Sequence, residues 1–290
     1  MSLLKKEELI KILPKDGPSI EETQKYLEKY IEDFIVIKMG GSVLSNKDLF
    51  NSLIQDIVIL KKLGLFIFLI HGGGSKISTK LDDLKIKSNF INGLRVTNDK
   101  TINIVENVLI EFNKEIVNAL KNQSCDAKAI TSKENNAILV QPENDELGFV
   151  GKPNKINCNI LTDAVKTNKV PVVASLGLDN NNQTFNINAD SVAGAIAKEL
   201  KARRLLIISD VEGVLNKEKI LIAEINSGQA KQMINDKIIS GGMIPKINNC
   251  LDVAKNGVKG VCIIDGRKNH SILFELLSDK GSGTLIREWK

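Results

Sequence analysis

Several residue types are scarce in this 290-residue chain, and each scarcity argues against a class of protein. Aromatic residues make up 4% of the sequence and are not interleaved with basic clusters, which argues against a nucleic-acid-binding surface. The apolar run near residues 63–70 is too short to cross a bilayer, and the N-terminus lacks the apolar core of a signal peptide. We therefore predict a cytoplasmic protein that binds neither nucleic acid nor membrane.

Histidine and cysteine are also scarce, with two and four residues. No two cysteines have the two-residue separation typical of a zinc site, so we predict no protein-bound metal. Free thiols in a reducing compartment are the simpler interpretation. The cysteines are Cys125, Cys158, Cys250 and Cys262.

The chain has an ordinary supply of apolar (42%) and charged (26%) residues and a net charge of +5. Apolar runs bounded by turn residues alternate with helical patterns, which is typical of a mostly parallel sheet covered by helices on both faces. The predicted fold class is therefore α/β, a three-layer αβα sandwich. Segments 141–155 and 179–186 break the alternation and are predicted to be hairpins or lids. Strands are predicted near 34–38, 65–70, 126–131, 136–140, 170–174, 204–208 and 260–264, and helices near 46–62, 74–84, 99–121, 156–167, 189–201, 227–235 and 244–256.

An additional helix is predicted ahead of the first strand. Ser19 and Glu22 form a capping-box pattern, and apolar residues follow at helical spacing. Because this helix precedes the compact α/β unit, we expect a partner subunit to cover its apolar stripe. Residues 1–33 are therefore predicted to be an oligomerisation segment.

Two glycine-rich turns follow the first two predicted strands. Lys38 precedes Gly40 and Gly41, and His71 precedes three glycines at 72–74. A strand that ends in glycines and opens into a helix presents backbone N–H groups to an anion. Neither turn is a P-loop or a dinucleotide fingerprint. Lys38 either reaches a bound phosphate or is a solvated lysine, and His71 is interpreted as an orienting group rather than a catalyst.

Further polar residues fall at strand exits and helix entries. Arg95, in a loop before a helix, either binds a ligand carboxylate through two parallel hydrogen bonds or forms a salt bridge at the helix start. The run from Asn186 to Asp190 holds more polar side chains than one helix cap needs. Segment 209–215 follows a strand at the ligand-binding edge of an α/β sheet. Lys246 lies in the first turn of a helix, where the helix dipole disfavours a cation unless an anion binds beside it.

In this order, the blocks resemble the amino acid kinase family, and within it the enzymes that phosphorylate N-acetylglutamate. The resemblance spans about residues 34–286 and implies the amino acid kinase fold. It also implies ATP-dependent phosphorylation of the γ-carboxylate of N-acetyl-L-glutamate, the second step of arginine biosynthesis, with ATP bringing Mg²⁺. The motifs are weak singly but specific together: K-x-G-G, H-G-G-G, G-L-R-V-T, L-G-F-V-G, N-x-N-A-D, S-D-V-x-G-V and G-G-M-x-x-K.

The resemblance assigns a role to each matching residue. Lys38 and Lys246 would stabilise the transferring phosphoryl group, and Asp190 would hold both lysines. Residues 34–184 would bind acetylglutamate and dimerise, and residues 185–290 would bind ATP. The acetylated substrate would contact Gly73, Gly74, Arg95 and Asn186, and the nucleotide would contact Gly40, Gly41, Asp210, Gly213, Leu215, Gly242 and Met243.

The N-terminal helix also resembles that of the arginine-inhibited members, which form a hexameric ring of dimers. This implies L-arginine as an inhibitor, a homodimer or homohexamer, and a PII-type regulator as a further partner. Ser282 departs from the pattern, which usually has isoleucine there. The arginine site would comprise Tyr26, His270, Glu275 and Gly283.

Two alternative functions stay open. One is a kinase for a related substrate such as N-acetylaminoadipate, against which the blocks around Arg95 and Asn186 favour the free acetylated amino acid. The other is a catalytically inactive arginine sensor or scaffold, against which the intact Lys38, Asp190 and Lys246 argue.

Overall fold

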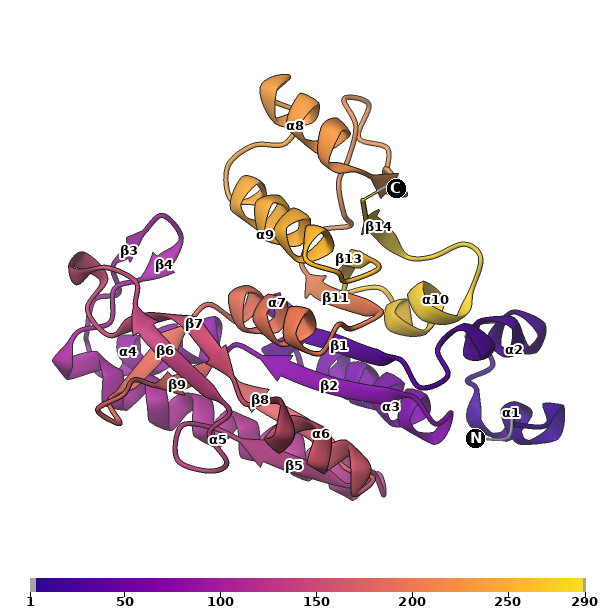
Figure 1. Ribbon diagram of the computed structural model, residues 1–290, viewed down its shortest axis with the longest axis horizontal. Helices are drawn as coiled ribbons and strands as arrows, with labels where there is room; N and C mark the ends of the chain where they lie inside the picture. Colours follow the sequence, from indigo (N-terminus) through magenta and orange to yellow (C-terminus); the bar gives the residue numbers. More distant parts are fainter. Residues whose placement is uncertain (1–3, 289–290) are drawn as a thin grey trace.

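The computed structural model describes residues 4–288 and confirms the predicted alternation of strands and helices (Figure 1). Eight strands form one continuous sheet, in which one neighbouring pair is antiparallel and the others are parallel. In sheet order they are β12 (Glu224–Ile225), β14 (Gly283–Ile286), β13 (Val261–Asp265), β11 (Arg204–Ser209), β1 (Phe34–Met39), β2 (Phe66–His71), β8 (Val170–Ala174) and β5 (Ala127–Ile130).

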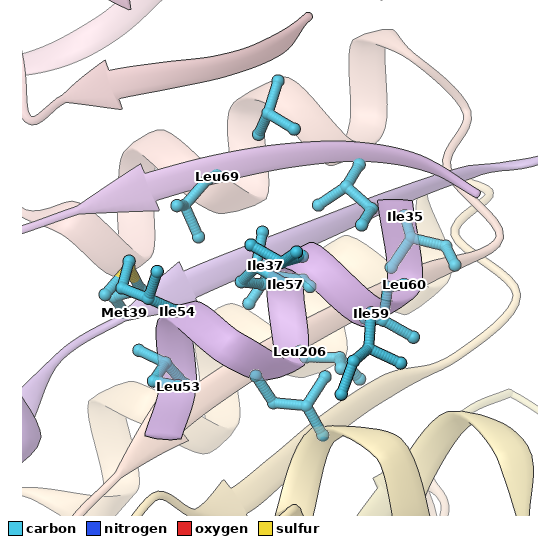
Figure 2. Close-up of a cluster of buried hydrophobic side chains, with 14 of the residues drawn as sticks. Ile35, Ile37, Met39, Leu53, Ile54, Ile57, Ile59, Leu60, Leu69 and Leu206 are labelled. Atoms are coloured by element: carbon cyan, nitrogen blue, oxygen red, sulfur yellow. The ribbon is translucent and has the colours of Figure 1, made fainter. Parts of the chain in front are cut away.

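Helices cover both faces of this sheet, so the predicted three-layer αβα sandwich is confirmed. Alternate residues of β1 face opposite layers, as expected for a strand buried on both sides. Ile35, Ile37 and Met39 pack toward the first layer (Figure 2), whereas Val36 and Lys38 face the second. The first layer contains α3 (Lys47–Lys62), α5 (Asp99–Asn122) and α10 (Ser271–Leu277), and the second contains α6 (Cys158–Lys166), α7 (Ala189–Glu199), α9 (Met243–Lys255) and α8 (Ser227–Asn235).

A small closed sheet and a short hairpin lie beside the main sheet. The predicted hairpins are confirmed: segment 141–155 contains the antiparallel turn between two strands of the small sheet, and segment 179–186 contains another. The small sheet comprises β6 (Ile138–Pro142), β7 (Val150–Ile156), β9 (Leu176–Leu178) and β10 (Thr184–Ile187), with the 3₁₀ turn η2 (Asp145–Leu147) between β6 and β7. The short hairpin pairs β3 (Phe90–Ile91) with β4 (Leu94–Arg95), after α4 (Gly74–Asp83). The 3₁₀ turn η1 (Gly41–Leu44) follows β1.

The N-terminal segment forms two helices, α1 (Lys6–Ile12) and α2 (Ile20–Lys29), of which only the second was predicted. Ser19 caps α2 in the predicted capping box with Glu22. The expectation that its apolar stripe needs a partner subunit is wrong. Leu27 and Tyr30 are buried within the same chain, where α2 packs against α10. The chain thus returns near its C-terminal end, and α10 covers the apolar stripe of α2.

Most predicted boundaries fall within two residues of the observed ones. The strand predicted at 136–140 instead spans β6, because the Asn136 side chain bonds both backbone groups of Ile138 and forms a turn there. Residues 271–277 and 283–286 form a helix and an antiparallel strand that the periodicity did not indicate. Within residues 4–288, no helix combines the length and apolar character needed to span a bilayer.

Candidate active site

A cavity of about 580 Å³ opens where the carboxyl ends of the central strands meet. The chain leaves β1 toward β2 and leaves β11 toward β13, in opposite directions along the sheet. Such a switch of direction creates the crevice in which α/β sheets bind ligands. Many residues predicted from the sequence line it: Lys38, Gly40, Gly41, Gly73, Gly74, Arg95, Asn186, Asp190 and Asp210.

Three charged side chains from separate elements meet beside this cavity: Lys38 and Asp190 line it, and Lys246 is not among its lining residues but contacts Asp190. Lys38 near the end of β1 points toward α7, where Asp190 occupies the second helical position. The Nζ of Lys38 lies 2.9 Å from Oδ1 of Asp190. The Nζ of Lys246, in the first turn of α9, lies 2.8 Å from Oδ2 of the same carboxylate. The Lys38 and Asp190 side chains are only 11% and 16% exposed. One carboxylate therefore holds two ammonium groups, as the resemblance implies.

The charge balance of this cluster favours a bound anion. Burial opposes ionisation of Asp190, but the positive charges of Lys38 and Lys246 outweigh it and lower the pKa of the carboxyl to about 2. The cluster thus carries two positive charges and one negative charge at neutral pH. The N-termini of α4 and α7 add positive potential from the residues that line the cavity.

Asn249, which the sequence reading missed, clamps α9 onto α7. Its side-chain amide donates to the backbone carbonyl of Asp190 at 3.1 Å. Gly194 on α7 permits this approach, since a Cβ there would lie 2.8 Å from Val253. Asn249 follows Lys246 by three residues and so lies on the same face of α9. That spacing is the signal that could have identified it.

The first glycine turn is shaped by its two charged neighbours. A Cβ at Gly40 would lie 2.1 Å from Nζ of Lys38, so the lysine folds back over this residue. Gly41 has φ +73°, and a Cβ there would lie 2.3 Å from Oδ1 of Asp210. Glycine is therefore required at 41 by backbone conformation, and at 40 to leave room for the ammonium group.

The second glycine turn is wedged between two helices. A Cβ at Gly72 would lie 3.3 Å from that of Ala189 at the start of α7, and one at Gly73 would lie 2.7 Å from Leu109 on α5. Gly74 begins α4 and has open space around it. The run of glycines thus lets the backbone itself form the cavity wall.

Arg95 lies in strand β4 rather than in the predicted loop. Its guanidinium donates to the Gly74 carbonyl (3.0 Å), to Ser78 (2.8 Å) and to Ser88. Within residues 4–288 no carboxylate forms an ion pair with it, so the alternative of a helix-start salt bridge does not hold. Burial lowers the pKa of this guanidinium. The attraction of Asp82 acts in the opposite direction, but no carboxylate among residues 4–288 lies close enough to form an ion pair, so the buried cation suits an anionic ligand.

Asn186, the other polar residue predicted to bind the substrate, lies in β10 and also lines the cavity. Its amide donates to Thr97 at 3.3 Å, and the Thr97 hydroxyl donates to the Arg95 carbonyl at 3.0 Å. The structure therefore joins the two predicted substrate-binding residues through one threonine.

Two buried polar residues on α5 escaped the sequence reading. Glu106 accepts hydrogen bonds from Ser132 (2.7 Å) and from Thr184 (2.6 Å) at the start of β10, the strand that carries Asn186. Asn113 contacts His71. Both occupy positions of the apolar stripe of α5, and polar side chains on an otherwise apolar stripe are the signal that could have found them.

Four residues predicted to bind the nucleotide do not line the cavity. Gly213 is packed against Thr284, Leu215 pairs with Leu221, and Gly242 and Met243 begin α9. They lie beyond β11, on the side of the sheet that β13 and β14 extend.

The residues predicted for an arginine site divide between the two ends of α10. Tyr26 on α2 donates to Asp279 just beyond its C-terminus at 2.8 Å. Glu275 accepts from the backbone N–H of Ser282 at 2.8 Å, and Ser282 directly precedes Gly283, the first residue of β14. His270 lies at the N-terminal end of α10.

His270 is buried and contacts two aspartates, of which Asp56 is buried and Asp16 is exposed. Its Nδ1 lies 2.6 Å from Asp56 on α3, and its Nε2 lies 3.3 Å from Asp16 between α1 and α2. The hydrogen bond with Asp56 raises the pKa of His270. The contact with Asp16 ties the N-terminal segment to the core.

All four cysteines are free thiols; Cys158 is half-buried and the others are buried. Burial raises the pKa of each thiol. Within residues 4–288 no group of three or more histidine, cysteine or acidic side chains could hold a metal ion.

Comparison with known proteins relates this site to a family. Residues 33–265 match the amino acid kinase family. The chain is 68% identical over 288 residues to the acetylglutamate kinase of Pelagibacter ubique (strain HTCC1062), covering 99% of this chain and 100% of that protein. It is 42% identical over 272 residues to the acetylglutamate kinase of Clostridioides difficile (strain 630), covering 92% of this chain and 95% of that one.

Among solved structures, the chain resembles the N-acetylglutamate synthase of Neisseria gonorrhoeae. The complex with coenzyme A and N-acetyl-glutamate gives a TM-score of 0.84 at 20% identity, covering 93% of this chain and 63% of the synthase. The complex with coenzyme A and L-arginine gives 0.81 at 19% identity, covering 93% and 64%. The chain thus spans about two thirds of the length of the synthase, and the likeness concerns the fold.

Proposed function

Because the chain belongs to the amino acid kinase family, we propose that the cavity is where a phosphoryl group passes from ATP to a carboxylate. The reaction is the ATP-dependent phosphorylation of N-acetyl-L-glutamate on its γ-carboxylate, in arginine biosynthesis. The observation that carries the proposal is the pair of lysines held on Asp190, which lines the cavity together with Lys38 and the two glycine turns. A sensor without activity would have no need of this buried cluster.

The chemistry requires charge neutralisation rather than a base. A γ-carboxyl group has a reference pKa of about 4.3, so the acceptor is already ionised at neutral pH. Two anions must then approach in line, and phosphoryl transfer gains mainly from positioning and electrostatic stabilisation. Lys38 and Lys246 supply positive charge from two directions. Asp190 keeps both ammonium groups in place without itself taking a proton, because its pKa is so low.

The acceptor side of the cavity would be formed by Arg95, Asn186 and the second glycine turn. We assign the α-carboxylate to Arg95, because this residue is buried, lines the cavity and forms no ion pair with a carboxylate among residues 4–288. Asn186 would hydrogen-bond a polar group of the acetylated substrate, and Gly73 and Gly74 would offer backbone N–H groups. We place acetylglutamate binding and dimerisation in residues 34–184.

The nucleotide side would be formed by residues 185–290 with the first glycine turn. Gly40 and Gly41 would offer N–H groups to the phosphates, and Mg²⁺ bound to ATP would neutralise part of their charge. Asp210, which lines the cavity, faces Gly41 at the β1–β11 junction. Gly213, Leu215, Gly242 and Met243 would contact the remainder of ATP, beyond the cavity.

An acceptor panel tests this function directly. Purified protein is given ATP and Mg²⁺ with N-acetyl-L-glutamate, L-glutamate, L-aspartate or N-acetyl-L-aminoadipate, and ADP release is followed. We expect turnover with N-acetyl-L-glutamate and little with the others. Preference for N-acetylaminoadipate would favour the related kinase, and no ADP release with any acceptor would favour the inactive sensor.

We further propose that L-arginine inhibits the enzyme at the α2–α10 contact. Tyr26 and Glu275 approach the segment 278–283 from two elements there. Addition of L-arginine, with D-arginine as the control, should raise the concentration of N-acetylglutamate needed for half-maximal rate. Unchanged kinetics at saturating L-arginine would refute the regulation and leave the kinase activity untouched.

We propose that the enzyme forms a homodimer or homohexamer, on which this regulation depends. We place it in the cytoplasm, where its thiols stay free. A PII-type regulator is proposed as a further binding partner. Ile10 on α1 is 58% exposed and offers an apolar contact for assembly. Sedimentation velocity of Ile10→Glu tests this, with Ile220→Glu as the matched control because Ile220 is exposed elsewhere. Dissociation of the first variant alone is expected, and identical profiles would exclude assembly through α1.

A further inference from the structure

Two buried polar side chains, His71 and Asn113, lie at the glycine turn 71–74. The proposed function gives neither of them a role. His71 ends β2 and Asn113 lies in α5, and neither is exposed. The Asn113 amide nitrogen lies 3.0 Å from Nε2 of His71 and donates to the backbone carbonyl of Val172 at 2.8 Å. On the other side of the ring, Nδ1 lies 2.9 Å from the carbonyl oxygen of Gly72.

These partners select one form of the imidazole. A backbone carbonyl only accepts hydrogen bonds, so Nδ1 of His71 carries the proton and donates to Gly72. Nε2 then accepts from Asn113, whose second N–H is used on Val172. Burial lowers the pKa of His71 to about 4, although the bond to Gly72 acts in the opposite direction. The ring is therefore neutral at neutral pH, with its proton on Nδ1.

The planar peptide carries this arrangement to the cavity. The carbonyl of Gly72 and the N–H of Gly73 belong to one trans peptide unit and point in opposite directions. Since the carbonyl is held toward the buried ring, the Gly73 N–H is turned away from it, toward the cavity that Gly73 lines. Within residues 4–288 no protein acceptor takes this N–H.

Without the histidine, this peptide would lose the contact that fixes the direction of its carbonyl, although the Gly72 N–H still donates to Met39 and the Gly73 carbonyl still accepts from Ile77. Glycine has no side chain to restrict its backbone, and the peptide between Gly72 and Gly73 is flanked by glycine on both sides. A rotated peptide would present its carbonyl oxygen to the phosphoryl group, which would repel an anion instead of binding it. The cost would fall on the transition state, where an oriented N–H donor contributes most.

We propose that His71 and Asn113 are positioning residues that aim the Gly73 N–H at the transferring phosphoryl group. The inference rests on the proposed function, because it assigns that group to this cavity. Asn113 donates to Nε2 and so keeps the ring proton on Nδ1. His71 donates from Nδ1 to the Gly72 carbonyl and so fixes the orientation of the Gly72–Gly73 peptide. The expected signature is a loss of kcat with little change in KM for either substrate.

Two amide substitutions of the histidine separate its two contacts. In His71→Asn the side-chain nitrogen takes the place of Nδ1 and still donates to Gly72. In His71→Gln the amide reaches the place of Nε2 and cannot make that bond. We expect kcat of His71→Gln to be lower than that of His71→Asn by about tenfold, a fraction of the loss when an anion-stabilising donor is removed. Equal kcat values in two variants of equal thermal stability would overturn the proposal.

Nitrogen NMR of ¹⁵N-histidine-labelled protein reads the tautomer without any substrate. The chain has two histidines, so His270 serves as the internal reference. We expect His71 to carry its proton on Nδ1 at neutral pH in the unmodified protein. In Asn113→Leu the proton should move toward Nε2, and kcat should fall. A proton on Nε2 in the unmodified protein would refute the inference.

The two hypotheses fail in distinguishable ways. If the unmodified protein releases no ADP with N-acetylglutamate, the proposed function fails, whatever the NMR shows. If it is active and His71→Gln retains the kcat of His71→Asn, the kinase function stands and the positioning role is rejected. If Asn113→Leu does not fold, the histidine pair and the spectrum of the unmodified protein still decide the question.

Discussion

Two aspartates of this molecule hold lysines in similar geometry and differ in depth. Asp190 lies in the cavity, 2.9 Å from Lys38 and 2.8 Å from Lys246, with 16% of its side chain exposed. Asp279 lies at the surface, 2.6 Å from Lys25, with 57% of its side chain exposed. The shorter contact is therefore the one that water surrounds.

The comparison shows that distance alone does not measure the strength of an ion pair. Solvent around Asp279 screens its attraction to Lys25, and an exposed pair of this kind contributes little to stability. Around Asp190, partial burial strengthens the attraction to both lysines enough to hold its pKa at about 2 despite the cost of desolvation. The buried cluster can therefore fix the lysines for chemistry, whereas the surface pair can be broken at little cost.

The largest expected effect comes from removing either lysine of the buried cluster. Lys38→Ala or Lys246→Ala should lower turnover by about a hundredfold or more, on the scale of a lost charge-stabilising donor. Steady-state kinetics of the purified variants measure this. Lys25→Ala is the matched control, since it removes a lysine from the surface aspartate, and its turnover should stay normal. Near-normal turnover in either cavity variant would break the comparison and the assignment with it.

A second test compares how the two histidines make the free energy of unfolding depend on pH. The pKa of His71 is lowered from 6.5 to about 4, so below pH 6.5 the unfolded chain binds a proton that the folded protein does not. Stability from this group is therefore complete above pH 6.5 and is lost as pH falls toward 4, by at most about 3 kcal/mol.

Denaturant unfolding across this pH range should show that loss in the unmodified protein but not in His71→Asn. His270 acts with the opposite sign, because its pKa is raised: its contribution is present below pH 6.5 and is lost as pH rises through the folded value. It is common to both proteins and cancels in their difference. Parallel stability curves for the two would contradict the buried neutral state of His71.

Gly40→Ala should have a smaller effect and should act through Lys38. The added Cβ would lie 2.1 Å from the Nζ of Lys38, whose flexible tip can move aside without unfolding the protein. We expect kcat to fall about tenfold, a fraction of the loss for a missing donor, with an unchanged thermal midpoint. The double variant with Lys38→Ala decides the cause: it should be no slower than Lys38→Ala alone. Additive losses would mean that Gly40 acts separately.

The smallest effect is expected at the surface aspartate. Asp279→Asn should leave basal turnover and the thermal midpoint nearly unchanged, because solvent already screens its pairing with Lys25. It should weaken the α2–α10 contact through Tyr26, and so raise the L-arginine concentration needed for half-inhibition. Asp190→Asn, measured alongside, should abolish most turnover. A loss of basal activity in Asp279→Asn as large as in Asp190→Asn would show that burial does not separate the two sites.

Features that depend on neighbouring residues were predictable. The capping box at Ser19 and Glu22, the bounds of α8 and the central strands follow from side chains within a few positions of each other. The cavity residues were identifiable because glycines and charges at strand exits gather at one edge of a parallel sheet. Their roles came from the resemblance of the motif set rather than from any single motif.

Features that depend on distant segments were not predictable from local pattern. The apolar stripe of α2 finds its cover on α10, near the other end of the chain, so the expectation of a partner subunit was wrong. Arg95 pairs into a two-residue strand whose partner, β3, gives no periodic signal. Glu106 and Asn113 look like interruptions of an apolar stripe until Thr184 and His71 are seen opposite them.

The sequence by itself determined the layered α/β architecture, the two glycine turns and the identities of the cavity charges, because these follow from local periodicity and from which residue types stand at strand ends. The resemblance implied that Asp190 holds both lysines, but only the tertiary structure decided how deeply this cluster is buried and that the ring of His71 contacts the Gly72 carbonyl. The physical reason is burial. Depth sets the dielectric, and so the strength of each charge and hydrogen bond, and depth is a property of the packed chain rather than of any segment within it.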